Sequence, residues 1–362
     1  MPLDQALPAS RPPAALARAR TASPPNRAIG AWLFGICFML LVMISLGGAT
    51  RLTGSGLSIM EWAPIMGVLP PLSDAEWHRL YGLYQQIPQY QLVNDGFGLA
   101  GFKSIFWLEW THRLWGRLTG IVFIVPLLWF AVRGRISARL GARLFLLFLL
   151  GGLQGAVGWF MVASGFAEGS TAVSAYRLVM HLGLALTLYA AILWTALETW
   201  RPVPVAAPRR LTRLLAAAAG LTAVTIIAGG FVAGLHAGKI YNTFPLMGGR
   251  LVPEDYAALQ PFPRNWTENL AAVQFDHRLL ATLTALLVTT TVIYGWRLSS
   301  GAGRRALLAL GGIVALQYVL GVTTLLWVVP VALATLHQAV AILLLSAALI
   351  ALYLHRNRRV GA

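Results

Sequence analysis

The sequence predicts an all-α integral membrane protein. It has eight transmembrane helices, arranged as two tandem four-helix bundles related by a pseudo-two-fold axis along the membrane normal. Three observations predict this fold. Of the 362 residues, 57% are hydrophobic and only 11% are charged, whereas soluble domains carry about 25% charged residues. Several apolar stretches can each cross a hydrocarbon layer about 30 Å thick. Motifs of the first stretches return in the later ones.

The apolar stretches of spanning length lie at roughly 29–49, 108–132, 143–163, 177–197, 213–235, 271–296, 306–328 and 334–354. Basic residues cluster in the N-terminal tail, at 133–143, 201–213 and 297–305, and after the last span. Clusters of this kind mark the cytoplasmic side, so both termini are expected inside. The net charge of +16 is spread between apolar runs instead of forming one basic patch. We therefore expect membrane lipid, and no nucleic acid, around the protein.

The sequence divides into four parts: a cytoplasmic tail at 1–28, an N-terminal half at 29–205, a C-terminal half at 206–355 and a basic cytoplasmic tail at 356–362. The first part, rich in Ala, Pro and Arg, also has the composition of a transit peptide, but we favour a tail. Cys37 is the single cysteine, so an intramolecular disulfide is excluded and a cysteine metal site is disfavoured.

Two long connections, 50–107 and 236–270, are expected outside, and both are rich in Gly, Pro and aromatic residues. In the first, Ser73 and Glu76 have the spacing of a capping box. The apolar residues that follow share one helical face. This pattern predicts a short amphipathic helix on the outer membrane surface.

An internal repeat relates the two halves. Glu109-Trp-Thr-His112-Arg113 near the start of the second span matches Gln274-Phe-Asp-His277-Arg278 in the sixth. Glycine pairs also match, at 47 and 48 in the first span and at 229 and 230 in the fifth. Because four spans separate the copies, the halves have the same orientation in the membrane. The glycine pairs are interpreted as helix-packing positions.

Four histidines are the strongest candidates for chemistry: His112, His181, His277 and His337. They are expected in the first turns of the second, fourth, sixth and eighth spans, at similar depth near the outer face. Imidazole is a good axial ligand for haem iron, and helices of a bundle can hold a porphyrin between them. A zinc or copper site would need a tighter cluster with carboxylate or sulfur nearby.

Simpler interpretations stay open for single histidines, which can be interfacial or hydrogen-bonded packing residues. His78 and His355 are assigned to a surface helix and a basic tail, where solvation explains them. His236 is left unassigned.

Glu109 precedes His112 by three residues, so both share a helical face, and its counterpart in the second half is Gln274. This difference suggests proton-coupled chemistry in the first half and cofactor binding alone in the second. The simpler alternative is a salt bridge from Glu109 to Arg113. Arg113 and Arg278 are candidate partners for haem propionates, along with other basic residues near the outer side.

Several long motifs run through the chain: Gly48-Ala-Thr-Arg51-Leu-Thr-Gly54-Ser-Gly56, Phe102-Lys103-Ser-Ile-Phe106-Trp107, Glu109-Trp-Thr-His112-Arg113, Tyr241-Asn242-Thr-Phe244-Pro245 and Gln274-Phe-Asp-His277-Arg278. In these motifs, and over nearly the whole chain after the tail, the sequence resembles the haem A synthase family. One branch of that family has a cysteine pair in the outer loops, and this chain resembles the other branch.

The resemblance implies a bacterial inner-membrane oxidoreductase that oxidises a methyl group of haem O to a formyl group, making haem A for terminal oxidases. By position, His277 and His337 resemble the ligands of a haem b in the C-terminal half. His112 and His181 resemble the pair flanking the substrate haem, and Glu109 the essential carboxylate. The implied partners are haem O and haem A, a haem O synthase, oxidase assembly factors and an electron donor.

Two other classes of protein remain as alternatives. A di-haem membrane cytochrome b would transfer electrons without making haem A, although conduction across the bilayer needs haems near both faces. A transporter would also show parallel repeats, but such proteins usually place their polar groups near the midplane.

Overall fold

The computed structural model describes residues 26–63, 66–202, 204–205 and 207–356. Within these ranges, eight helices are long and apolar enough to cross a membrane, which confirms the predicted number of spans. The described residues form no β-sheet, only one isolated bridge between Met247 and Arg250. Most of the two predicted tails, 1–28 and 356–362, lies outside the described residues.

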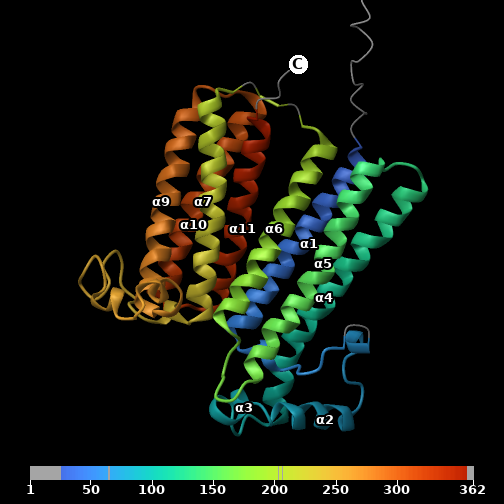
Figure 1. Ribbon diagram of the computed structural model, residues 1–362, viewed down its shortest axis with the longest axis vertical. Helices are drawn as coiled ribbons and strands as arrows, with labels where there is room; N and C mark the ends of the chain where they lie inside the picture. Colours follow the sequence, from blue (N-terminus) through green and yellow to red (C-terminus); the bar gives the residue numbers. More distant parts are fainter. Residues whose placement is uncertain (1–25, 64–65, 203, 206, 357–362) are drawn as a thin grey trace, which may run out of the picture.

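The long helices of the first half are α1 (Arg27–Leu52), α4 (Gly98–Val132), α5 (Ala138–Ala163) and α6 (Ala175–Trp200). Those of the second half are α7 (Arg209–Gly234), α9 (Leu270–Trp296), α10 (Gly301–Leu326) and α11 (Val331–Leu354). Figure 1 shows them as two bundles side by side. The start of α1 and the end of α11 lie at the same end of the molecule. We call this the terminal end, and the opposite end the loop end.

Local sequence sets several helix boundaries. The side chains of Asn26, Ser137 and Asn269 accept hydrogen bonds from backbone N–H groups in the first turns of α1, α5 and α9, which satisfies donors that a helix start leaves unpaired. Pro330 precedes α11 and cannot donate to a preceding turn.

Each half closes into a ring of four helices. In the first half, α1 and α5 each pack against both α4 and α6. In the second half, α7 and α10 pack in the same way against α9 and α11. Consequently, the two histidine-bearing helices of each ring stand at opposite corners.

The halves meet along a seam in which α1 lies against α11 and α6 against α7. These are the contacts that a two-fold arrangement of equivalent helices requires. The axis itself stays a prediction.

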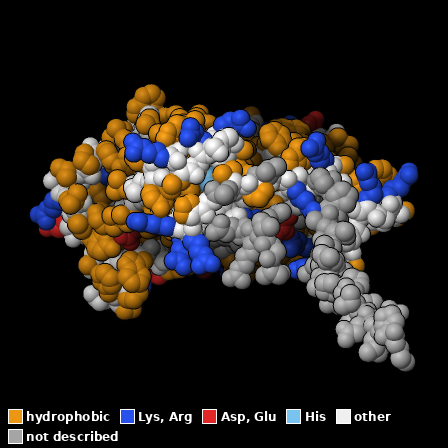
Figure 2. Space-filling view, turned by 90° about the horizontal axis from the view of Figure 1, so that it is seen from above, with side chains coloured by type: hydrophobic (Ala, Val, Ile, Leu, Met, Phe, Trp, Pro, Cys, Tyr) orange, Lys and Arg blue, Asp and Glu red, His pale blue; other side chains and the backbone are white. Residues whose placement is uncertain are grey.

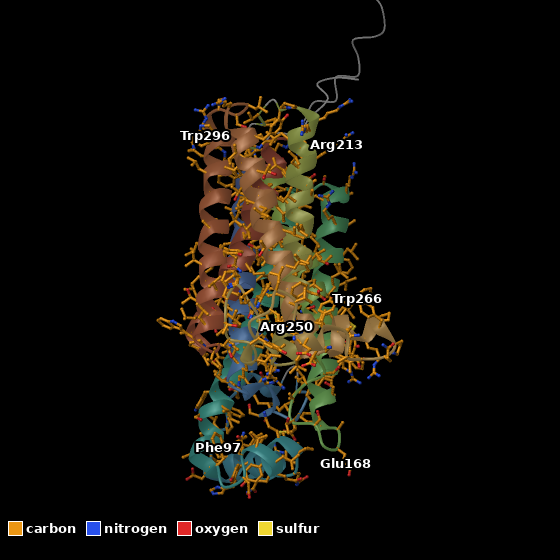
Figure 3. The ribbon with its side chains drawn as sticks, turned by 90° about the vertical axis from the view of Figure 1, so that its left-hand side faces the viewer. Phe97, Glu168, Arg213, Arg250, Trp266 and Trp296 are labelled. Atoms are coloured by element: carbon orange, nitrogen blue, oxygen red, sulfur yellow. The ribbon has the colours of Figure 1, made fainter. Side chains whose placement is uncertain are left out.

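The terminal end carries most of the basic residues of the short connections, including Arg143, Arg213 and Arg304. Figure 2 looks onto this end and shows basic side chains at several places across it. Glu198 pairs there with Arg143 at 2.5 Å and with Arg356 at 3.7 Å. At the loop end, Figure 3 shows Phe97 and Glu168 of the first half lying farther out than Arg250 and Trp266 of the second half.

The first outer connection folds into the helices α2 (Asp74–Tyr84) and α3 (Pro88–Val93). Half of the predicted capping box is present, since Ser73 accepts a hydrogen bond from the Glu76 N–H at 3.2 Å. The predicted short helix is confirmed as α2, but its apolar face does not turn toward lipid. Trp77, Leu80 and Tyr84 are instead buried in a core that they share with residues of α4.

The second span begins ten residues earlier than predicted, at Gly98 instead of 108. The added turns carry Phe102 and Phe106, which pack against α2. His112 therefore lies about four turns into α4, whereas His181, His277 and His337 lie in the second turns of their helices. A helix extended by packing on another segment explains why hydropathy alone placed its start too late.

Candidate functional site

The four predicted histidines share one environment. Each imidazole lies against a glycine of the neighbouring odd-numbered span: His112 against Gly47, His181 against Gly158, His277 against Gly229 and His337 against Gly321. A Cβ added at these glycines would lie 2.9 to 3.0 Å from the ring Cε1, which is closer than side chains tolerate. Each glycine therefore makes room for a ring, a role beyond the helix packing that the sequence predicted for residues 47 and 229.

The arrangement repeats between halves in detail. The first histidine of each half packs on the first helix of its ring, and the second histidine packs on the third helix. A glutamine stands one turn before the glycine of that third helix. Gln154 Nε2 lies 3.1 Å from His181 Nδ1 and donates to the His181 carbonyl at 3.0 Å, and Gln317 Nε2 lies 3.5 Å from His337 Nε2.

These glutamines were not assigned a role from the sequence, although the repeat contained the signal. Leu-Gln followed by glycine four residues after the glutamine occurs at the same place in both halves. The spacing of four puts the two side-chain positions on one helical face. The repeat of this glutamine and glycine in both halves could have indicated that the two residues contact the same side chain, which is the second histidine of each half.

In each ring, the two imidazoles at opposite corners are the side chains that would hold a haem. His112 Nδ1 and His337 Nδ1 are buried and have no hydrogen-bond partner among the described residues. A buried polar atom without a partner is costly, and a turn of the ring that brings Nδ1 to an acceptor or to a bound ligand would remove this cost.

His277 has the tautomer that a haem ligand needs. Its Nδ1 lies 3.2 Å from the Thr225 carbonyl, which can only accept, so Nδ1 carries the proton and Nε2 is left free for iron. All four rings are only partly buried and so keep surface for a ligand.

Glu109 is buried, with 4% of its surface exposed, and Arg113 Nε donates to it at 2.6 Å. This is the salt bridge that the simpler interpretation expected. Arg113 also donates to the carbonyls of Ile59 and Glu61 at 2.7 and 2.9 Å. It thereby ties the first outer connection to α4.

The second half repeats this clamp with an amide. Arg278 donates to Gln274 Oε1 at 2.9 Å and to the carbonyls of Tyr241 and Thr243 at 2.6 and 2.9 Å. Gln274 is buried and donates through Nε2 to the carbonyls of Ala237 and Ile240. Both arginines predicted as propionate partners therefore hold outer-loop backbone in this structure.

The three remaining histidines have distinct settings. His78 is exposed on α2, as expected. The assignment of His355 to a solvated tail was wrong, because it is fully buried at the end of α11. There Nδ1 donates to the Ala351 carbonyl at 2.7 Å and Nε2 lies 2.9 Å from Ser299 Oγ. It serves as a packing residue of the terminal end.

His236 occupies a left-handed turn, with φ of 57°, directly after α7. Gly54, with φ of 70°, stands at the equivalent place after α1, and each begins a short 3₁₀ turn. Partial burial, together with the nearby charges of Arg51 and Lys239, lowers the pKa of His236 to about 4.

Comparison with known proteins gives one consistent result. Residues 30–349 match the model of the cytochrome oxidase assembly protein family. The chain is 62% identical to the haem A synthase of Granulibacter bethesdensis over 90% of this chain and 86% of that protein. It is 49% identical to the haem A synthase of Rhodospirillum centenum over 90% and 87% of the two chains.

A third relative is haem A synthase 2 of Acidiphilium cryptum, which is 46% identical over 95% of this chain and 96% of that one. The range matched by the family model, 30–349, includes both rings, both outer connections and the positions of all four histidines. Together with the eight spans and the duplicated histidine pockets, it shows that the chain belongs to the cytochrome oxidase assembly protein family.

Proposed function

We propose that the protein is a haem A synthase, a membrane oxidoreductase that converts haem O to haem A. The observation that carries this conclusion is the duplicated pocket of two histidines and two glycines. One turn before the first histidine, the first copy has the buried Glu109 and the second copy has the buried Gln274. The relatives named haem A synthase support the same activity. Haem O is then the substrate and haem A the product.

The two pockets are assigned different contents. His277 and His337 would hold a resident haem b, because the position one turn before their first histidine carries the neutral Gln274 in place of Glu109. His112 and His181 would flank the substrate haem beside Glu109. In both pockets, the ring-contacting glycines let the histidines lie close to the neighbouring helix, which fixes the direction in which each imidazole points.

A porphyrin methyl group is too inert for acid–base chemistry alone. Its conversion to a formyl group is a four-electron oxidation that adds one oxygen atom, for which bound haem iron would activate an external oxidant. Glu109 would contribute by accepting a proton or by stabilising positive charge that develops near the methyl group. Arg113 holds the carboxylate in position by the 2.6 Å contact. The same arginine ties Ile59 and Glu61 of the outer connection to α4, which would limit the access of water to the pocket.

The orientation follows from charge. We place the protein in the bacterial inner membrane with both termini in the cytoplasm, because basic residues gather at the terminal end. The haem sites then lie toward the periplasmic side. The pairing of α1 with α11 and of α7 with α6 supports a pseudo-two-fold axis along the membrane normal.

The decisive experiment is co-expression with a haem O synthase in a host that makes no haem A, followed by chromatography of the extracted pigment. Haem A, or a hydroxylated intermediate, is expected only when both proteins are present. Bound haem without either product would instead identify a di-haem cytochrome b, and a colourless protein would favour transport. The electron donor, the haem O synthase and oxidase assembly factors are the proposed partners, and membrane lipid surrounds the spans.

A further inference from the structure

In each half, the side chain of the residue after the second histidine contacts the other half across the seam. Gln338 follows His337 on α11 and faces α1, while Leu182 follows His181 on α6 and faces α7. Each of them contacts the second member of a glycine pair in the opposite half. The first member of the same pair contacts a histidine of that opposite half.

The contact between α11 and α1 is polar. Gln338 Nε2 donates to the carbonyl of Ile44 at 2.9 Å. Gly48, one turn later on α1, leaves room for this amide, since a Cβ there would collide with Gln338. The neighbouring Gly47 lies against His112. A single hydrogen bond therefore joins the helix of His337 to the turn of α1 that supports His112.

The matching contact between α6 and α7 is apolar. A Cβ added at Gly230 would lie 3.0 Å from Leu182 Cδ2 and 3.1 Å from Val179 Cγ2. Gly229, next to it, lies against His277. This contact has no directional bond near the histidines, so it constrains the sliding of one helix past the other less than the hydrogen bond of Gln338 does.

We propose that Gln338 is a positioning residue that sets the relation of the two histidine pockets by clamping α11 to α1. This inference rests on the proposed function for its catalytic consequence, but its structural part does not need it. The Ile44 carbonyl has two lone pairs and can also accept the helical bond from the Gly48 N–H. Replacing Gln338 by leucine therefore leaves no unsatisfied carbonyl, and leucine is the residue found at the equivalent position 182.

The first test measures the seam without haem chemistry. Spin labels are placed at Thr53 and Ala332, exposed near the loop ends of α1 and α11, in a Cys37→Ser background, and their distance distribution is recorded. Gln338→Leu should broaden or shift this distribution. Tyr189→Phe is the matched control, because it removes another bond across the seam, 2.7 Å from Tyr189 Oη to Ser346 Oγ, far from the histidines. An unchanged distribution in Gln338→Leu, or an equal change in the control, would overturn the proposal.

The second test uses the protein co-expressed with haem O synthase. Gln338→Leu should keep its haem b and produce about three- to tenfold less haem A per haem b, the range expected for losing one interhelical hydrogen bond in a membrane. Gln338→Glu should recover activity as the pH is lowered, because only the protonated acid can donate to the Ile44 carbonyl.

Loss of haem b in proportion to activity in Gln338→Leu would mean that the residue only supports His337, against the proposal. If the unmodified protein made no haem A while the spin-label distances still responded to Gln338→Leu, the proposed function would fail and the positioning role would stand.

Discussion

The two halves hold their histidines in the same way but differ one turn before the first histidine. Glu109 and Gln274 both bind the arginine that follows four residues later, and each arginine clamps an outer connection. An amide is therefore sufficient for the clamp. The negative charge in the first half is not required by the architecture, which is why we assign it to the chemistry.

The difference also has a structural consequence. Gln274 donates to the carbonyls of Ala237 and Ile240 in the turn after α7, but an ionised carboxylate has no proton to donate. In the first half, Gln89 of α3 provides such a bond by donating to the Gly54 carbonyl at 3.0 Å. The outer connection of the first half thus supplies, through Gln89, the hydrogen-bond donor that the ionised Glu109 cannot supply.

The strongest way to break the comparison is to remove a histidine from each half. His277→Ala should lower the resident haem content of the purified protein by more than about tenfold, since even residues that only orient a ligand contribute 10- to 100-fold to affinity. His112→Ala should retain that haem and lose haem A formation. Pyridine haemochrome spectra measure the difference. Equal haem loss in both variants would contradict the assignment of different contents to the two pockets.

Making the first pocket resemble the second is the next test. Glu109→Gln keeps an acceptor for Arg113, so the fold and haem content should be unchanged. Haem A formation should fall by about 10² to 10⁴, the usual contribution of a positioned acid or base. His78→Gln, on the exposed face of α2, is the control for a polar change outside the pockets. Normal activity in Glu109→Gln would leave the salt bridge to Arg113 as the only role of the carboxylate.

Much of this arrangement could be predicted from residues whose signal is local. Hydropathy predicted the eight spans, and the repeat predicted that His112 and His277 occupy equivalent positions in the two halves. The extension of α4 to Gly98 and the burial of Trp77 could not be predicted, because both depend on contacts between segments that are far apart in the sequence. His355 was misassigned for the same reason, since Ser299 of the connection after α9 and Gly303 of α10 enclose it.

The glycine contacts test whether the pockets are equally tight. Gly47→Ala and Gly229→Ala would each place a Cβ 2.9 to 3.0 Å from a histidine Cε1, and overpacking of this kind costs about 1–3 kcal/mol. Gly229→Ala should weaken retention of the resident haem, whereas Gly47→Ala should spare it and slow haem A formation. Gly151→Ala, where a Cβ meets nothing within 4 Å, is the control. Retention of haem and activity in both pocket variants would show that the rings can shift without consequence.

The smallest expected effect concerns the turns after α1 and α7, where Gly54 and His236 are equivalent. The pKa of His236 is lowered to about 4 in the folded protein, while an unperturbed histidine titrates near pH 6.5. Between these values, the unfolded chain binds a proton that the folded protein does not. The free energy of unfolding therefore falls as the pH drops from about 6.5 toward 4. His236→Asn, which tolerates a left-handed turn, should reduce the slope of melting temperature against pH in this window. An identical slope in both proteins would show that neither burial nor the charges of Arg51 and Lys239 lower the pKa of this ring in the folded state.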